Sequence, residues 1–498
     1  MKRRQVFLNA VTALLQVIGN AAILFFLYRF LIRAIGIERL GIWSLVLATT
    51  SVITLANQGF STSIVKFVAK YVARENPNDV SALIETSLLS VGTVLGVALI
   101  VLYPAAKWIL KALLPQTAIH EAREILPFAF VSLWINVTGN ILQAGLAGHE
   151  LITQCNYVDL ATSALYLALA ILLVPQRGLL GLAYAQLAQS AAFFTATWLL
   201  LRRCVPSLSL VPRHWSRCLF REAAGYGAQF QFITAAQALR EPATKALLTK
   251  FGGLAMTGFY DVAARFVVTV RELIVQANQV LLPTVAGLHE RDPHSIPALY
   301  RESYRLIFFL AIPSFAFLVV VSPIVSLIWI RHYEPIFISF VALLAAGWLI
   351  NVLSNPAYVM CLGTGALRSV SIGCAATAIL NVLLGFAAGR FFGGTAVVGA
   401  SVLSLSIGYI FVLFSYHIAN RTPFAQLLPP DSTVIILSSL FGLIIFFPLL
   451  RGSQGHPLLS LRTTVPIMAA LFAVIVVPMW IHPMRKRVVN WVLSKAPA

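Results

Sequence analysis

The sequence predicts an all-α polytopic membrane protein with about fourteen transmembrane helices, arranged as two pseudo-symmetric six-helix bundles around a central cavity plus two C-terminal helices. Apolar residues make up 59% of the 498 residues and charged residues 11%, whereas a soluble domain has roughly 45–50% and 25%. Long apolar segments follow one another along the chain, and two sequence patterns recur at a common spacing. These observations exclude a soluble globular domain and favour a duplicated membrane unit.

The apolar segments are long enough to cross a hydrocarbon core of about 30 Å, which needs roughly 20 apolar residues. The first segment is longer than the roughly 7–15 apolar residues of a signal peptide, so we expect it to remain as the first helix. The predicted spans are 5–32, 41–62, 82–103, 125–147, 155–174, 179–201, 224–249, 258–286, 306–330, 336–361, 369–389, 396–418, 432–450 and 463–483.

Basic residues are distributed unevenly between the loops on the two sides. With the N-terminus in the cytosol, the cytosolic loops and tails hold 20 Lys and Arg and the opposite loops hold 11. This excess follows the positive-inside rule for an even number of helices with both termini in the cytosol. The formal net charge of +19 follows largely from this excess, so we expect attraction to anionic membrane lipids and no nucleic acid partner.

Two patterns recur at nearly the same spacing, which indicates the duplication of a membrane unit of about 200 residues. Duplicated halves that face one another place a substrate path at the midplane in many transporters. The patterns are Gly36-x4-Gly41-x-Trp43, which returns as Gly253-x4-Gly258-x-Tyr260, and Asn136-Val-x-x-Asn140, which returns as Asn351-Val-x-x-Asn355.

The duplication and the spans divide the chain into four predicted regions. Residues 1–201 form an N-terminal six-helix bundle, and residues 222–420 form a C-terminal six-helix bundle. Residues 202–221 form a basic cytosolic linker in which aromatic residues alternate with arginines, and residues 421–498 hold two additional transmembrane helices and a basic tail. The linker either fixes the membrane orientation or steers a substrate, and both interpretations fit its composition.

Charged residues inside the hydrocarbon are costly and by default face a bundle interior or a wet cavity. In this chain they cluster in the spans 224–249 and 258–286. Polar residues of the first of these spans cover an arc of roughly 160°, which implies water or a polar ligand beside the helix. We predict a cationic cavity, because guanidinium groups bind phosphate oxygens bidentately. The predicted substrate-binding residues are Arg29, Arg240, Lys245, Arg265, Arg271, Gln237, Asn140 and Asn355.

Several alternatives to ligand binding stay open for these residues. Glu241 with Lys245, and Asp261 with Arg265, are i,i+4 partners that could neutralise each other. The asparagines are suited to bonds between helices as well as to sugar contacts. Pro242 predicts either a hinge or a fixed bend. The acids that are candidates for coupling transport to an ion gradient are Asp159, Glu241, Asp261 and Glu272.

No catalytic or metal-binding signature accompanies the spans. The sequence has no P-loop and no C-x-x-C pair, and its extracytosolic loops are too short to hold a catalytic domain. We therefore expect no enzyme activity, no cofactor, no metal site and no disulfide.

Several segments carry a resemblance to a known family. They are residues 31–43, which end in Gly-Ile-Trp, then 56–60, 66–71 and 143–149, and the Gly258-Phe-Tyr260 segment leading to Leu282-Pro283. Through them the chain resembles the polysaccharide transporter (oligosaccharide or O-antigen flippase) family of the multidrug/oligosaccharidyl-lipid/polysaccharide (MOP) exporter superfamily.

The resemblance implies two six-helix bundles arranged as a V, plus two extra helices. It also implies translocation of an undecaprenyl-pyrophosphate-linked oligosaccharide across a bacterial-type cytoplasmic membrane by alternating access, as in lipopolysaccharide and other polysaccharide biosynthesis. We expect a monomer that contacts a polysaccharide polymerase or glycosyltransferases. A cation-coupled drug antiporter of the same superfamily would favour uncompensated acids, and a membrane glycosyltransferase or polymerase would need a large extracytosolic loop.

Overall fold

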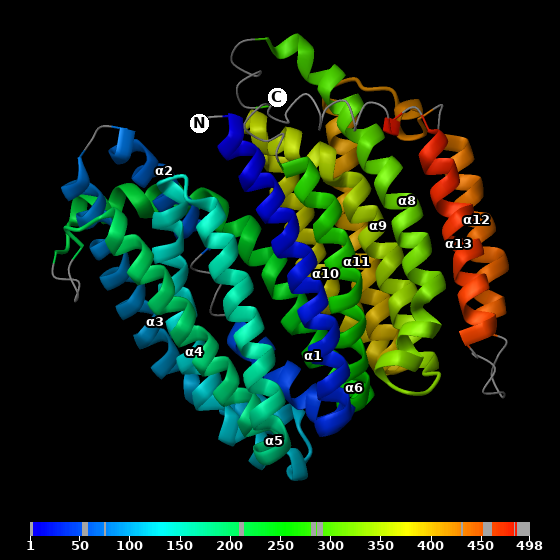
Figure 1. Ribbon diagram of the computed structural model, residues 1–498, viewed down its shortest axis with the longest axis horizontal. Helices are drawn as coiled ribbons and strands as arrows, with labels where there is room; N and C mark the ends of the chain where they lie inside the picture. The colour runs from blue at the N-terminus through cyan, green and yellow to red at the C-terminus, as the bar shows by residue number, and fades with distance from the viewer. Residues whose placement is uncertain are drawn as a thin grey trace. The chain divides into compact units, whose positions relative to one another are not determined.

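The computed structural model describes residues 3–51, 58–73, 76–208, 214–279, 285, 292–429, 432–451, 461–482 and 484–485. Within these ranges the regular structure is helical, and no strand occurs (Figure 1). The prediction of an all-α fold is therefore confirmed.

The helices fall into two compact units, residues 1–258 and 259–498, and α6 (Arg217–Gln279) crosses from one to the other. The four regions predicted from the duplication remain a prediction. The first unit holds α1 (Arg3–Ser51), α2 (Gln58–Ala73), α3 (Pro77–Leu113), α4 (Gln116–Gly148) and α5 (Ile152–Cys204). The second holds α8 (Ile296–Trp329), α9 (Pro335–Thr364), α10 (Leu367–Phe392), α11 (Gly394–Ala419), α12 (Thr433–Arg451) and α13 (Leu461–Ile481), with short 3-10 turns at Pro293–Ser295 and Phe424–Leu427.

Nine of the described helices are long and apolar enough to cross a membrane. Three of these, α1, α5 and α6, each contain a glycine with non-helical backbone angles that divides the helix into two arms. Counting each arm separately and adding the apolar helices α12 and α13 gives fourteen apolar segments. The chain is thus a multi-pass membrane protein, and the apolar segments counted in this way among the described residues equal the predicted spans in number.

The glycines that divide the helices show the duplication in the backbone. Gly36 (φ 80°, ψ 167°) and Gly253 (φ 82°, ψ 178°) open the recurring glycine pattern in the two repeats and adopt nearly the same conformation. Gly178 (φ 56°) and Gly393 (φ 80°) are separated by the same interval as the two asparagine pairs, and each lies between two consecutive apolar segments. Positive φ favours glycine, because a Cβ atom is strained there. The second glycine pair has no counterpart among the recurring sequence patterns.

Helix boundaries follow the same spacing. When the ends of α5, residues 152 and 204, are shifted by the interval between Gly178 and Gly393, they fall on residues 367 and 419. These are the beginning of α10 and the end of α11. The duplication therefore extends well beyond the glycine and asparagine patterns.

The turns that follow Gly36 and Gly253 contact each other reciprocally within residues 1–258. A Cβ atom added to Gly41 would overlap the carbonyl oxygen of Leu254, and a Cβ atom added to Gly258 would overlap the carbonyl oxygen of Ile37. Ile37 directly follows Gly36, and Leu254 directly follows Gly253, so each repeat presents the same two positions to the other. This arrangement is that of an isologous contact around a two-fold axis.

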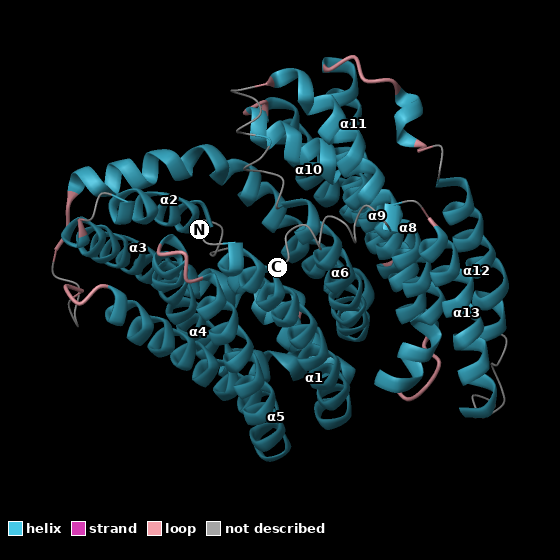
Figure 2. Ribbon diagram, turned by 45° about the horizontal axis from the view of Figure 1, so that its top comes forward, coloured by secondary structure: helices cyan, strands magenta, loops and turns pink. Residues whose placement is uncertain are grey.

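In the first unit, α4 packs against α5, α2 and α3, and α1 packs against α5 (Figures 1 and 2). Its core joins apolar residues of α2, α3, α4 and α5, such as Val68, Ile84 and Leu142. Val205 and Leu208, which follow α5, are buried in the same core. The chain beyond α5 is thus attached to this bundle.

In the second unit, α9 packs between α8 and α11, and α10 packs along α11. The two C-terminal helices α12 and α13 pack against α8, where Val320 and Leu471 are buried together (Figure 1). They extend this bundle through α8.

Candidate functional site

The predicted site residues lie in both units. On α6, the Nζ atom of Lys245 is 2.8 Å from Oε1 of Glu241, which precedes it by one helical turn. The lysine side chain is 3% exposed and the glutamate side chain 46%. The local pairing that the sequence left open is therefore present, and the buried ammonium has an acid partner.

Arg240 and Gln237 lie on the preceding turns of α6. Arg240 is 9% exposed, and its carbonyl oxygen accepts a hydrogen bond of 2.9 Å from the hydroxyl group of Thr244. Gln237 is half-buried. This face of α6 is thus polar and largely buried around Pro242, in keeping with the predicted polar arc.

Arg29 lies in the first arm of α1. Its Nε atom is buried and has no hydrogen-bond partner among the described residues. An unsatisfied buried donor is rare and indicates a place for water or an anionic ligand. Among the predicted cationic residues of the first unit, Arg29 is therefore the one whose side chain has a buried donor without a partner among the described residues.

Asp159 of α5 is held by two amide groups from neighbouring helices. Its Oδ2 atom accepts a hydrogen bond of 2.9 Å from Gln16 of α1, and its Oδ1 atom accepts one of 2.8 Å from Gln143 of α4. One turn earlier, Asn156 donates a bond of 3.2 Å to Thr12. Within the described ranges no basic residue forms an ion pair with Asp159. The helices α1, α4 and α5 thus enclose a carboxylate whose observed partners are neutral.

In the second unit, two residues of α9 fix Arg271 of α6. The Nε–H group of Arg271 donates a hydrogen bond of 3.0 Å to Oδ1 of Asn351, which is 2% exposed. The guanidinium carbon lies 4.8 Å from the ring centroid of Trp348. A hydrogen bond along one edge and an aromatic ring on one face together define the plane of the guanidinium group.

The remaining predicted residues differ in their exposure. Asp261 and Asn355 are buried, whereas Arg265 and Glu272 are exposed. In α4, Asn140 donates a bond of 3.3 Å to Asn136, so this pair is bonded within one helix. The equivalent pair in α9 is more buried, and its Asn351 bonds to another helix.

Sequence reasoning did not select several partners of these residues. Trp348 precedes Asn351 by three residues and therefore shares its helix face, a spacing that could have identified it. Gln16 and Gln143 are polar residues in apolar spans, which is also a usable signal.

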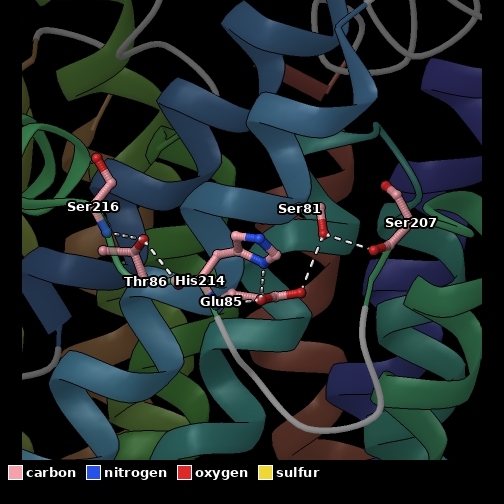
Figure 3. Close-up of polar contacts among 6 residues, drawn as sticks. All are labelled: Ser81, Glu85, Thr86, Ser207, His214 and Ser216. Atoms are coloured by element: carbon pink, nitrogen blue, oxygen red, sulfur yellow. Dashed lines mark hydrogen bonds and ion pairs between the residues drawn. The ribbon is translucent and has the colours of Figure 1, made fainter.

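Glu85 of α3 is a further residue that the sequence analysis did not select, although it lies inside the predicted span 82–103. It is 1% exposed, and its Oε2 atom accepts a hydrogen bond of 2.9 Å from the backbone N–H of His214 (Figure 3). The Nδ1 atom of His214 lies 3.4 Å from the same oxygen. Glu85 therefore joins α3 to the segment between α5 and α6.

Residues 30–338, more than half of the chain, match the model of a family described as polysaccharide biosynthesis protein. No curated protein matches the sequence.

Solved structures with a similar fold include an inward-facing multidrug resistance MATE family transporter of the MOP superfamily, with a TM-score of 0.72 and 16% identity over 84% of this chain and 99% of that chain. The lipid II flippase MurJ in an inward closed conformation has a TM-score of 0.72 and 13% identity over 95% of this chain and 97% of that chain. An outward-facing MATE family transporter has a TM-score of 0.62 and 15% identity over 84% and 97%. These similarities establish the fold of the chain.

Proposed function

Because the chain belongs to the polysaccharide biosynthesis protein family, we propose that it is a flippase that moves a lipid-pyrophosphate-linked oligosaccharide across the cytoplasmic membrane by alternating access. The lipid carrier would be of the undecaprenyl type. The protein would act as a monomer without catalysing a chemical reaction, with both termini in the cytosol, and would hand its cargo to a polymerase or receive it from glycosyltransferases.

Arg271 is the residue that supports this proposal most directly. Its guanidinium group is held by a hydrogen bond to Asn351 and by the ring of Trp348. A fixed guanidinium loses little side-chain freedom on binding and presents paired N–H donors to phosphate oxygens. A pyrophosphate is the part of the proposed cargo that is common to all glycans, so it is the expected ligand of Arg271.

Other cations are candidates for binding the same class of ligand. Arg29 has a buried donor without a partner among the described residues, and Arg240 is buried on the polar face of α6. Lys245 already balances Glu241, so we assign it a smaller part in binding. Gln237, Asn140 and Asn355 are suited to the sugar hydroxyl groups.

The reciprocal contact of Gly41 and Gly258 supports alternating access. It joins the turn after the first span to the equivalent turn of the second repeat, on the side that the charge distribution predicts to be extracytosolic. We infer that this contact closes the exit while the site loads from the cytosol. Release to the outer leaflet would then require the two turns to separate.

Asp159 is the acid that we propose for coupling. A carboxylate inside a membrane bundle whose observed partners are neutral amides can take up and release a proton or a monovalent cation without breaking an ion pair. Glu241 is paired with Lys245, so its charge is less available for this role.

A cation-coupled drug antiporter is the alternative within the same fold, since MATE transporters are similar to this chain. One observation favours the flippase. The alignment with MurJ extends over 95% of the chain, whereas those with the MATE transporters extend over 84%. Buried and half-buried arginines such as Arg240 and Arg271 also suit an anionic cargo better than a cationic drug.

Binding by the purified protein tests the proposal. We expect an undecaprenyl-pyrophosphate-linked oligosaccharide to bind, undecaprenyl monophosphate to bind more weakly, and a cationic dye not to compete. Arg271→Ala should weaken binding of the pyrophosphate lipid by about 10-fold or more, the scale of a lost charged hydrogen bond. Arg390→Ala, which removes an exposed arginine at the end of α10, is the matched control and should bind normally. Binding of the dye in place of the lipid would favour the antiporter.

A further inference from the structure

Residues 202–221 run from the last turn of α5 to the first turn of α6, and residues 209–213 among them lie outside the described ranges. Residues 207 and 214–216 of this segment contact side chains along one face of α3. We call this segment the basic connector. The Ser81 hydroxyl donates to the Ser207 carbonyl oxygen, and Glu85 accepts from the backbone N–H of His214 (Figure 3). Thr86 accepts from the backbone N–H of Ser216, and Ser90 accepts from the indole N–H of Trp215.

The central contact is the one made by Glu85. A buried carboxylate needs polar partners, and here Oε2 accepts the backbone N–H of His214 and lies 3.4 Å from Nδ1 of the same residue. The Ser81 hydroxyl, which donates to Ser207, also lies 3.5 Å from Oε1. The backbone contacts at Ser207 and Ser216 lie on either side of His214. The described parts of the connector are therefore fixed at several points.

The connector also follows α3 into the predicted span 82–103, so we expect it to reach the membrane surface. Ser81 and Ser90 are nine residues apart, so their attachment points are separated by about 13 Å along α3. Trp215, attached at the deeper point, is 55% exposed. Tryptophan with its N–H satisfied and its ring exposed is typical of the boundary between headgroups and acyl chains.

The connector carries basic side chains near both of its ends. Arg202 and Arg203 end α5, and Arg217 and Arg221 begin α6. All four are exposed, and within the described ranges none of them forms an ion pair. The imidazole of His214, on the outer side of Glu85, is 80% exposed.

We propose that the basic connector is a docking surface for the headgroups of anionic phospholipids, and that Glu85 holds it in the orientation that binds them. The positive charge, the exposed tryptophan and the attachment along the predicted span 82–103 each fit a lipid headgroup. The surface lies at the chain junction between the repeats. It does not depend on which substrate the transporter carries.

The first test counts retained lipids. Native mass spectrometry of the full chain, released from bilayers of phosphatidylglycerol and phosphatidylethanolamine, should show preferential retention of phosphatidylglycerol. The combined variant Arg202→Gln, Arg203→Gln, Arg217→Gln and Arg221→Gln should lose this preference several-fold. The matched control removes four exposed charges elsewhere, with Lys111→Gln, Arg123→Gln, Arg177→Gln and Arg390→Gln, and should keep it. Equal losses in both variants would mean that only total charge matters, and would overturn the proposal.

The second test uses Glu85→Gln. A charge-only explanation and an orienting role for Glu85 predict opposite changes in the retention of anionic lipid. If charge alone governs retention, removal of an acid should strengthen the binding of anionic lipid. If Glu85 orients the connector, retention should fall although no basic residue has changed. Thr86→Val removes the Ser216 anchor without a change of charge and should act in the same direction as Glu85→Gln.

These outcomes are independent of transport. Stronger or unchanged retention in folded Glu85→Gln and Thr86→Val proteins would overturn the orienting role. Unchanged lipid retention in the four-arginine variant, with loss of a co-purifying acidic protein, would assign the surface to a protein partner instead. Loss of oligosaccharide binding by Arg271→Ala would not affect either result.

Discussion

Gly41 and Gly258 occupy equivalent positions of the two repeats, and each packs against the backbone of the turn that carries the other. The contact leaves no room for a side chain on either residue. Because it is reciprocal, it places a local two-fold axis between the turns 37–41 and 254–258. Such an axis is the structural signature of duplicated transporter halves.

Substitution of these glycines should weaken the contact. We predict that Gly41→Ala or Gly258→Ala raises the free energy of the closed state by about 1–3 kcal/mol, because the new Cβ atom overlaps a backbone carbonyl oxygen that cannot rotate away. A cysteine placed near either turn should then react faster with a membrane-impermeant thiol reagent. Gly399→Ala is the control, since a Cβ at that position of α11 meets nothing within 4 Å. Equal reactivity in all three variants would show that the contact is not a gate.

The geometry of Arg271 makes a prediction about charge and shape. Arg271→Lys keeps the positive charge but loses the Nε–H bond to Asn351 and the flat face over Trp348. We expect it to bind the pyrophosphate lipid nearly as poorly as Arg271→Ala. Trp348→Leu should weaken binding about 2- to 30-fold, the range expected for one cation–π contact. If Arg271→Lys binds the pyrophosphate lipid as tightly as the unchanged protein, only the positive charge at this position contributes to binding.

Asp159 leads to a prediction about driving force. Asp159→Asn should fold, because an amide can still bond with Gln16 and Gln143, but it cannot change its charge. Transport by this variant should no longer respond to a proton or sodium gradient, as measured in vesicles with an imposed gradient. Asp79→Asn, in the first turn of α3, changes the same charge outside this cluster and should respond normally. A gradient-dependent Asp159→Asn protein would remove Asp159 from the coupling step.

The pair formed by Glu241 and Lys245 predicts a stability effect. Glu241→Gln leaves a buried ammonium without its acid, and we expect a loss of about 1–3 kcal/mol, because the glutamate itself is partly exposed. Combining it with Lys245→Met should restore most of the melting temperature in detergent. If Glu241→Gln is as stable as the unchanged protein, the pair contributes nothing to folding.

Much of the fold could be predicted, because apolar composition identifies membrane helices and the recurring glycine pattern identifies the repeat. Gly36 and Gly253 stood out in the sequence because both belong to a longer pattern. Gly178 and Gly393 did not, because their equivalence resides in backbone conformation and the residues around them have diverged. A symmetry of backbone conformation is visible only in the three-dimensional structure.

The site was harder to predict because contacts between helices have no fixed sequence spacing. The pair Glu241 and Lys245 could be foreseen from its separation of four residues. Asn351 lies 80 residues from Arg271, and Gln16 and Gln143 lie 143 and 16 residues from Asp159, all on helices whose rotation the sequence does not reveal. Glu85 could have been selected as a charged residue inside the predicted span 82–103, but its partner His214, 129 residues further along the chain, could not be foreseen.

Translocation in proteoliposomes measures the proposed flippase activity itself. The purified protein is reconstituted with a fluorescent undecaprenyl-pyrophosphate-linked oligosaccharide, and the fraction of cargo that an external membrane-impermeant glycosidase can reach is followed in time. We predict that the unchanged protein and Arg390→Ala move cargo between leaflets and that Arg271→Ala does not. If Arg271→Ala translocates cargo at the same rate, Arg271 is not the pyrophosphate-binding residue. If the unchanged protein translocates none under an imposed gradient of either sign, it is not a flippase for this cargo.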